Sequence, residues 1–435
     1  DDALAPLLEA VRATRPAPLL IVTADHGEAL GDHGEETHGM FVYEATMRVP
    51  LVISPPPAGV APGTRIRDAV SNVDLAATLL ERFGIGRAAL PQSRTPLLPT
   101  ADADPDGDRA LYLESITPYY AHRQHPLRAV VWKGMKFIET RRPELYALVD
   151  DPTEKVDLIA VKTELRGAFE QRLAGLIAEN PPLEWDSEHT RSADDISGLK
   201  AIGYAAASAR GNPFVDPDLP DAKDRIGDLK IIDQVAALMR DGSMLLGLDG
   251  RPRPNLTAEQ RAEGQRRGRE MLEQARQLIE QLKDVNPKDP MIPVMLSTIH
   301  LGLRNFKEAA TVIEQVVTED PRHPINHYNL SHAYSELKRA DWSKRELEKA
   351  VYLEPRMLYG LRLLAALAIE AKDWPAAACW LDRLETCPGQ TEQELANVKR
   401  RREQVQAKLA ERNLQPAAAP TFTDAELLPE GTRQQ

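Results

Sequence analysis

Short apolar runs alternate with amphipathic segments over the first 205 residues. Residues 19–23 and 49–54 are unbroken apolar runs rich in β-branched side chains, which predict strands covered on both faces. Residues 3–13 and 71–83 carry apolar side chains three and four positions apart, which predicts helices. Residues 128–139 have strand–turn–strand character around a Lys-Gly pair. This alternation predicts an α/β domain with a mostly parallel sheet.

Beyond this region the pattern becomes helical and repeats. Pro287, Pro321 and Pro355 lie 34 residues apart, and apolar or small residues recur in the same register between them. These positions are Leu296, Leu330 and Leu364; Ser297, Ser331 and Ala365; Ala309, Ser343 and Ala377; and Ile313, Leu347 and Leu381. The small residues mark places where two helices approach closely. The period resembles that of the tetratricopeptide repeat, a helix–turn–helix unit, and predicts an all-α helical array.

The composition between and after these regions sets the expected domain boundaries. Residues 224–240 predict the first helix of an upstream half-repeat, followed by an insertion at 241–255, and 392–413 predict an end helix. We therefore expect a catalytic-type domain over 1–205, a Pro-rich linker at 206–223, a repeat array with end helix over 224–413 and a disordered tail at 414–435.

Charge and cysteine content narrow the function classes. The net charge is −12 in 435 residues, which argues against a nucleic-acid binder. No run of 18 apolar residues is present, so no membrane span is expected. Only Cys379 and Cys387 occur, so no disulfide framework is expected. The acidic segment 1–16 lacks the apolar stretch of a signal peptide.

Candidate chemistry follows the first predicted strand. Asp25 and His26 stand where that strand ends, and Gly27 lets the backbone turn away. A carboxylate and a neutral imidazole there could hold a divalent cation. His38, in "THG", could stabilise charge on a leaving oxygen or donate a proton to it. The alternative is that Asp25 only caps the turn and that His38 is an ordinary loop histidine.

Longer motifs resemble the sulfatase family of the alkaline-phosphatase superfamily. They are "TADHGEALGDHGE", "RVPLVI", "VSNVDLAATLLERFGI", "ELYALVDDPTEKVDL" and "LKAIGY". In the fourth motif Leu145, Tyr146, Asp151, Pro152 and Glu154 match the family pattern, while Ala147 stands in place of the usual Asp. The resemblance covers residues 1–205 and implies the C-terminal part of a sulfatase catalytic domain, fused to tetratricopeptide repeats.

The resemblance also implies roles for single residues. Asp25 and His26 match the family's second metal-binding pair, and His38 matches the residue that contacts substrate at the bridging ester oxygen and assists catalysis. The family habit is Ca²⁺, whereas an imidazole ligand suits Mn or Zn better. Asp32 and His33 are interpreted as structural loop residues.

The family mechanism needs parts that these 435 residues do not show. A Cys or Ser in C/S-x-P-x-R, oxidised to formylglycine, and an early Asp-Asp pair are both missing. Asp1-Asp2 precedes a predicted helix instead. We therefore expect the N-terminal half of the catalytic domain to be absent, and the chain alone to be inactive.

Three functions remain open at this point. The first is a metal-dependent sulfatase, a sulfuric ester hydrolase acting on a sulfated small molecule or glycan. The second is a phosphodiester or phosphonate hydrolase, or a phosphoethanolamine-type transferase, of the same superfamily. The third is a non-catalytic tetratricopeptide scaffold with a protein or peptide partner in the repeat groove. The family habit suggests a periplasmic or secreted location.

Overall fold

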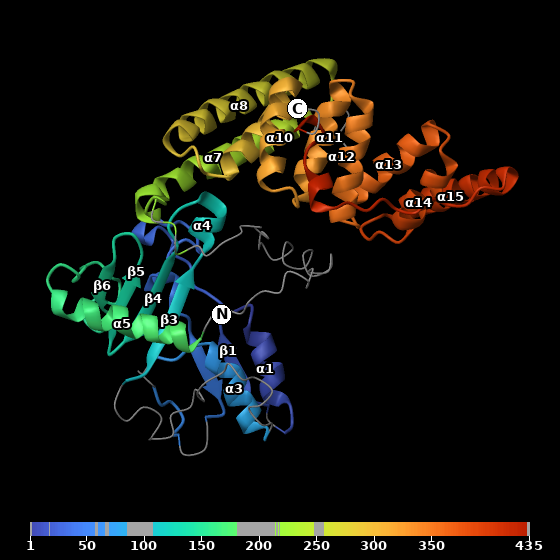
Figure 1. Ribbon diagram of the computed structural model, residues 1–435. Helices are drawn as coiled ribbons and strands as arrows, with labels where there is room; N and C mark the ends of the chain where they lie inside the picture. Colours follow the sequence, from blue (N-terminus) through green and yellow to red (C-terminus); the bar gives the residue numbers. More distant parts are fainter. Residues whose placement is uncertain are drawn as a thin grey trace. The chain divides into compact units, whose positions relative to one another are not determined.

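The computed structural model describes residues 2–16, 18–56, 60–65, 69–84, 108–180, 214, 216, 218–247 and 256–432 (Figure 1). The chain divides into two compact units. The first, here called the sheet unit, comprises residues 1–119, 124–185 and 212–226. The second, here called the repeat unit, comprises residues 120–123, 186–211 and 227–435. Most of the predicted linker and the "LKAIGY" motif lie outside the described residues.

The sheet unit alternates short strands and helices. In chain order they are α1 Ala5–Ala13, β1 Leu20–Thr23, the 3-10 helix η1 Asp32–Gly34, α2 Glu44–Met47, β2 Leu51–Ser54, α3 Val73–Arg82, β3 Ala110–Ser115, α4 Thr117–His122, β4 Leu127–Trp132, β5 Met135–Glu139, β6 Glu144–Ala147 and α5 Thr163–Glu179. The helices predicted over 3–13 and 71–83 are confirmed as α1 and α3, and the strand–turn–strand over 128–139 is confirmed as β4 and β5.

The prediction of a mostly parallel sheet is wrong for the described strands. β1 pairs with β2 in antiparallel register, and β3, β4, β5 and β6 form an antiparallel sheet in chain order. The connections from β4 to β6 are too short for a helical crossover, so the chain returns as hairpins. Lys133 (φ 50°) and Gly134 (φ 72°) form the two-residue turn between β4 and β5. Strand β1 is also not covered on both faces, since Val22 is 38% exposed.

The core of the sheet unit lies between the four-stranded sheet and α5, which crosses it in Figure 1. Val130, Phe137 and Leu145 from β4, β5 and β6 pack against Phe169 and Leu173 of α5. All five side chains are nearly or fully buried. Burying each such side chain contributes roughly 1.5–3 kcal/mol, so this contact holds β4–β6 as a firm platform.

The repeat unit consists of helices and a short C-terminal segment. Its elements are α7 Ala222–Leu246, α8 Ala258–Val285, α9 Met291–Leu303, α10 Phe306–Glu319, α11 Pro324–Glu336, α12 Ala340–Leu353, α13 Leu358–Glu370, α14 Trp374–Glu385, α15 Glu392–Arg412 and the 3-10 helices η3 Asp424–Leu427 and η4 Glu430–Thr432. The first residues of α7, up to Ile226, are grouped with the sheet unit.

The 34-residue period is confirmed as three helix pairs, α9–α10, α11–α12 and α13–α14. All twelve residues that the sequence placed in register are buried. At the close approach of α11 and α12, Ser343 Oγ donates to Ser331 O at 2.9 Å. Helix α7 runs six residues further than the predicted 224–240, so the start of the predicted insertion is helical.

The expectation of disorder at 414–435 is contradicted over the described residues 414–432. Two 3-10 helices form there, and Phe422 and Leu427 are buried against the array. The segment is rich in Pro and Ala, which suggested disorder, but these apolar side chains find a surface to pack on. In Figure 1 the red segment that ends with η4 lies beside α12.

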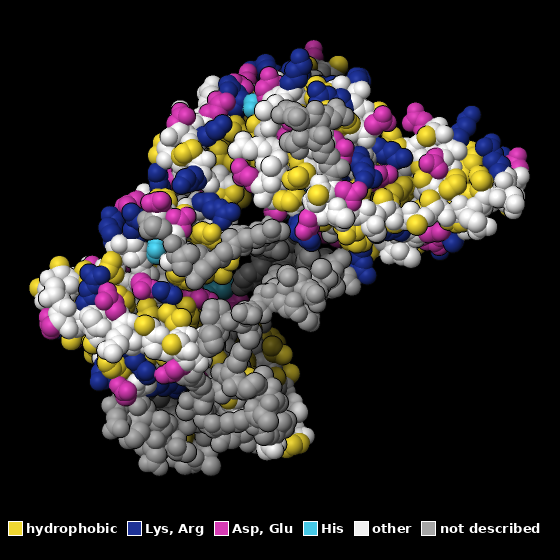
Figure 2. Space-filling view, in the orientation of Figure 1, with side chains coloured by type: hydrophobic (Ala, Val, Ile, Leu, Met, Phe, Trp, Pro, Cys, Tyr) yellow, Lys and Arg dark blue, Asp and Glu magenta, His cyan; other side chains and the backbone are white. Residues whose placement is uncertain are grey.

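The visible surface of the repeat helices mixes both signs of charge, as Figure 2 shows. On α8, Arg266 pairs with Glu263 at 2.7 Å and with Glu270 at 2.6 Å. Such pairs one helical turn apart support a long solvent-facing helix by a few tenths of a kcal/mol each. None of the helices described here is both long and apolar enough to cross a membrane.

Candidate metal centre

The loop that leaves β1 carries the predicted metal pair. Asp25 Oδ1 accepts a hydrogen bond from His26 N at 3.0 Å, which holds the pKa of this exposed carboxyl below its usual value. Its other oxygen, Oδ2, lies 3.7 Å from His26 Nε2. The Asp25 side chain is 82% exposed, so the carboxylate lies at the surface, with Oδ2 beside the imidazole of His26.

Gly27 fixes the course of this loop through a close backbone approach. Gly27 N donates to Thr46 O at 2.7 Å, and an added Cβ would lie 2.3 Å from Ala45 O. Only glycine lets α2 pass so close behind the loop. Gly27 therefore allows the Asp25–His26 pair to lie close to α2.

His26 and His38 come together although eleven residues separate them. Their rings stack at 3.7 Å between centroids with an interplanar angle of 27°. His38 Nδ1 lies 2.9 Å from Glu28 Oε1. Ligand atoms of His26, Glu28 and His38 all lie within 4.8 Å of one another, which is the only such group of three or more His, Cys, Asp or Glu among the described residues. Asp25 is not part of this group but touches it through His26.

Sequence reasoning missed Glu28. It lies inside the quoted "TADHGE" motif, two positions beyond His26, and its acidic side chain beside two histidines was the available signal. The spacing alone does not show that the chain turns back to bring His38 beside it. The structure supplies that turn through the bonds Ala29 N to Thr37 O at 2.7 Å and Gly31 N to Glu35 O at 2.8 Å.

The second half of the loop is anchored in the protein interior. His33 stacks on Tyr43 with ring centroids 3.5 Å apart, and burial lowers the pKa of its imidazole. Asp32 forms an ion pair with Lys155. The buried carboxylate of Glu35 accepts from Met40 N at 2.7 Å, while burial raises its pKa. These contacts agree with the structural interpretation of Asp32 and His33.

A fully buried lysine ties the loop to the sheet. Lys136 on β5 pairs with Glu44 at 2.8 Å and with Glu154 at 2.9 Å, and it donates to Val42 O at 2.9 Å. Burial raises the pKa of Glu154, and the ammonium of Lys136 opposes that shift. Here Glu44 braces the loop, and Lys136 is the anchor that sequence reasoning overlooked.

The "ELYALVDDPTE" segment acts as a support for this loop. Asp151 accepts from Val156 N at 2.8 Å, and that bond keeps the carboxyl's pKa low. The turn it closes carries Glu154 to Lys136. Tyr146 packs edge-on against Tyr43 and His33. Ala147 lies at the end of β6, opposite Met135, and its methyl group offers no ligand.

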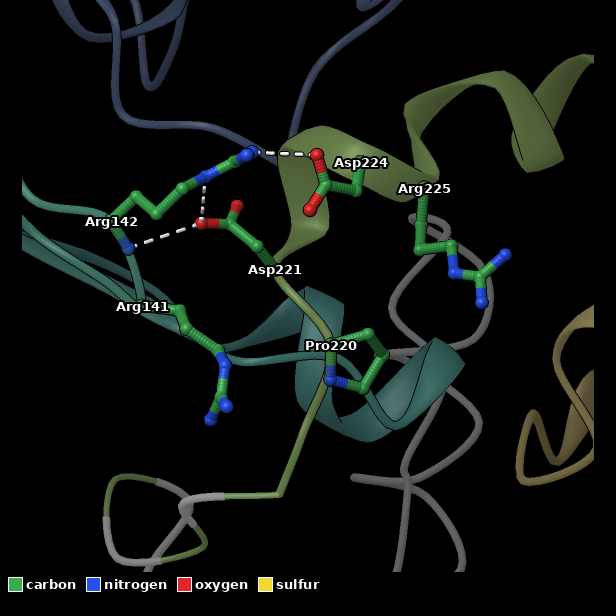
Figure 3. A pocket seen from close by; sticks show the side chains of 6 residues that line it. All are labelled: Arg141, Arg142, Pro220, Asp221, Asp224 and Arg225. Carbon is green, nitrogen blue, oxygen red and sulfur yellow. Dashed lines mark hydrogen bonds and ion pairs between the residues drawn. The ribbon is translucent and has the colours of Figure 1, made fainter.

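A surface depression of about 380 Å³ lies elsewhere in the sheet unit (Figure 3). Figure 3 shows Arg142 directed at Asp221 and Asp224, with Arg141 and Arg225 pointing away from that pair. Arg142 lies 2.6 Å from Asp224 and 3.4 Å from Asp221, so its charge is already balanced. None of Asp25, His26, Glu28 or His38 lines this depression.

Comparison with known proteins supports the resemblance of both units. Residues 31–178 match the family model described as N-sulphoglucosamine sulphohydrolase, C-terminal, and residues 326–357 match the tetratricopeptide repeat. Arylsulfatase K of Bos taurus is 29% identical over 208 residues, 45% of this chain and 37% of that protein. Arylsulfatase K of Xenopus laevis is 26% identical over 172 residues, 36% of this chain and 31% of that protein.

The chain spans about a third of the length of these curated relatives. The matched family region includes His38, Lys136 and Glu154, so the second half of the loop and its support fall in the part that is similar to sulfatases, whereas Asp25, His26 and Glu28 precede it. This chain therefore joins a region similar to the C-terminal part of sulfatases to an array of tetratricopeptide repeats.

Proposed function

We propose that this chain supplies one side of the metal centre of a metal-dependent sulfatase that hydrolyses sulfate esters. The observation that carries the proposal is the stacked His26–His38 pair with Glu28, on an anchored loop that leads into the region similar to sulfatases, which begins at residue 31. The substrate class is a sulfated small molecule or glycan.

The residues present fit a divalent ion. His26 Nδ1 lies 2.9 Å from Gly27 O, and a ring N–H donated to that carbonyl leaves Nε2 as the ligand atom. Two ligands at about 2.0–2.2 Å from one ion can be at most about 4.4 Å apart. His26 Nε2 and Asp25 Oδ2 are 3.7 Å apart, within that span. Asp25 and His26 would hold the ion together, with Glu28 and His38 at its edge.

The donor set bears on the choice of metal. Ca²⁺ takes six to eight oxygen ligands, whereas imidazole nitrogens suit Zn or Mn. The imidazole of His26 as a ligand beside the Asp25 carboxylate favours Zn or Mn over the Ca²⁺ expected from family habit. The bound ion would polarise an oxygen of the sulfate group.

His38 is placed to act on the leaving oxygen. Glu28 accepts from His38 Nδ1 at 2.9 Å, which fixes the ring and leaves Nε2 for the substrate. A histidine oriented by a carboxylate can donate a proton to the departing alcohol or stabilise its charge. Glu28 is then a positioning residue for His38. A phosphoester substrate remains the alternative, because a histidine-rich donor set serves phosphoryl oxygens equally well.

Metal binding by the chain is the direct test of this centre. Titration calorimetry with Zn²⁺, Mn²⁺ and Ca²⁺ is expected to show one site, tightest for Zn²⁺ or Mn²⁺. His26→Ala should weaken it by about 10–100-fold, which is the size of effect seen when ligands or their supports are altered. His332→Ala, an exposed histidine of the repeat unit, is the control. Unchanged binding in His26→Ala would contradict the assignment.

Hydrolysis tests the function itself. The gene read in frame upstream of Asp1 should encode a nucleophile loop, and its full product should hydrolyse p-nitrophenyl sulfate faster than p-nitrophenyl phosphate. His38→Ala in that product should lower kcat by about 10²–10⁴-fold. Preference for the phosphate would replace the sulfatase assignment with the phosphoesterase one.

For the repeat unit we propose a protein-interaction role, because tetratricopeptide arrays present extended surfaces to peptides. We also propose a periplasmic or extracellular location for the intact protein, in keeping with the sulfatase family.

A further inference from the structure

The C-terminal segment of the repeat unit is held like a ligand. Residues 421–432 lie on a surface here called the tail site, which is formed by Arg345, Glu346, Lys349 and Tyr352 of α12, Tyr334 of α11 and Glu314 of α10. Residues 413–418, which connect the segment to α15, are exposed. The segment is therefore joined to α15 by an exposed connection, and residues 421–432 contact the tail site.

Aromatic and aliphatic side chains provide the first recognition element. Phe422 is 7% exposed and packs edge-on against Tyr352, with ring centroids 5.4 Å apart. The guanidinium of Arg345 lies 4.4 Å from the centre of the same ring, a cation–π contact. Leu427, at the end of η3, is 1% exposed. A ligand of this surface would therefore carry two apolar side chains, five positions apart, that become buried on binding.

A buried ion pair provides the second element. Lys349 is fully buried; it donates to Glu346 Oε1 at 2.7 Å and to Leu428 O at 2.7 Å, and it pairs with Glu430 at 2.9 Å. Glu346 is shared, since its Oε2 lies 2.6 Å from His327 Nδ1. Without Glu430, the single carboxylate of Glu346 would serve both Lys349 and His327. Glu430 supplies a second carboxylate.

A glycine provides the third element. Gly431 N donates to Tyr334 Oη at 3.2 Å. A Cβ at this position would lie 2.7 Å from Glu314 Oε1 and 3.0 Å from Tyr334 Oη. These atoms are the ends of side chains and can move aside, so Gly431 contributes its backbone N–H and a close fit, not a strict requirement for glycine. At the rim, Arg322 pairs with Asp424 at 2.5 Å, which favours an acidic ligand.

We propose that the tail site is a peptide-binding site of the repeat array and that residues 421–432 are its built-in competitor. Its partners would be acidic peptides with a buried aromatic residue, a leucine five positions later and a glutamate after the leucine. Such a peptide binds only when the tethered segment leaves. This proposal is independent of the sulfatase function, because it involves the repeat unit alone.

The tether makes the competition strong. A short flexible connection presents its end at an effective concentration of roughly 1 mM. If the tail segment itself binds with a dissociation constant of about 10 µM, a free peptide would bind the closed chain about 100-fold more weakly than an open chain.

The test uses the full chain and a fluorescein-labelled peptide of residues 417–432. In a tail-released chain carrying Phe422→Ala and Glu430→Ala, fluorescence anisotropy should show peptide binding, about 100-fold tighter than in the wild-type chain. Adding Lys349→Met or Arg345→Ala to the tail-released chain should abolish or weaken it. Thr421→Ala, at an exposed position of the same segment, should behave as wild type.

Two outcomes would overturn the proposal. Equal peptide affinity in wild-type and tail-released chains, or no binding by a tail-released chain with unchanged circular dichroism, would show that the tail site is not an exchangeable site. Loss of helical structure in the tail-released chain would make residues 421–432 part of the repeat fold instead of its ligand. Arg345→Ala, at the half-exposed edge of the site, distinguishes lost recognition from lost folding if Lys349→Met does not fold.

Discussion

Among the described residues, each unit contains one fully buried lysine, and the two have almost the same surroundings. Lys136 of the sheet unit and Lys349 of the repeat unit both have 0% side-chain exposure. Each is paired with two glutamates and donates to one backbone carbonyl. Burying an ammonium alone would cost several kcal/mol, so both lysines depend on these acceptors.

The two lysines differ in where their partners come from. Lys136 joins Glu44 beside the candidate loop to Glu154 of the turn after β6, and all three belong to the folded sheet unit. Lys349 has Glu346 one turn away on its own helix, whereas Glu430 arrives on a tethered tail. The same chemistry therefore serves as a permanent anchor in one unit and as a releasable one in the other.

The largest effect is expected from removing the anchor of the sheet unit. Lys136→Met leaves Glu154 buried beside Glu44 with no cation, and breaking such a buried pair costs about 3–5 kcal/mol. Guanidinium denaturation should show this loss in the transition of the sheet unit. Combining it with Glu154→Gln should recover part of the loss, because the uncompensated charge is gone. Lys162→Met, at an exposed position, is the control, and an equal loss there would contradict the argument.

Removing the equivalent lysine of the repeat unit should cost less. In Lys349→Met the tail can leave, so water reaches Glu346 and Glu430, and we expect a loss of about 1–3 kcal/mol, as for a broken charged hydrogen bond. Hydrogen exchange should show faster exchange of the amides of Glu430 and Gly431. Lys344→Met on the same helix serves as control. A loss of unfolding free energy as large as in Lys136→Met, without faster hydrogen exchange in the tail, would contradict the proposed difference between the two lysines.

The repeat unit was predictable from sequence because its period places the same kind of residue at the same packing position each time. Leu330, Ser331, Ser343 and Leu347 are buried as the register required. The candidate loop was predictable only in part. "ADHG" pointed to Asp25 and His26, but the partner Glu28 depends on a turn that no periodicity encodes.

The overlooked features share a physical cause. Nothing in the sequence signals the burial of Lys136 and Lys349, because a lysine is almost never fully buried unless it is paired, and here partners distant in sequence contribute to the pairing. The tail was predicted to be disordered because its few apolar residues cannot form a core alone; Phe422, for example, is buried against Tyr352 of α12. The sheet direction was misjudged because apolar runs do not reveal whether a connection is a hairpin or a crossover.

The smallest effect is expected at the turn between the two helices of each repeat. Arg304, Lys338 and Lys372 lie 34 residues apart and all have positive φ, 65°, 62° and 58°. Each stands between the two helices of a repeat, where a side chain costs roughly 1 kcal/mol relative to glycine.

Lys338→Gly should therefore stabilise the repeat unit by about 0.5–1 kcal/mol, partly offset by the greater freedom of glycine in the unfolded chain. The matched change in the sheet unit is Lys133→Gly, in the hairpin turn at φ 50°. It should stabilise less, because Lys133 also lies over the Trp132 ring at 4.5 Å and loses that contact. Thermal unfolding of both variants measures the difference. A destabilised Lys338→Gly would mean that the lysine stem, and not the backbone, decides stability at the turn.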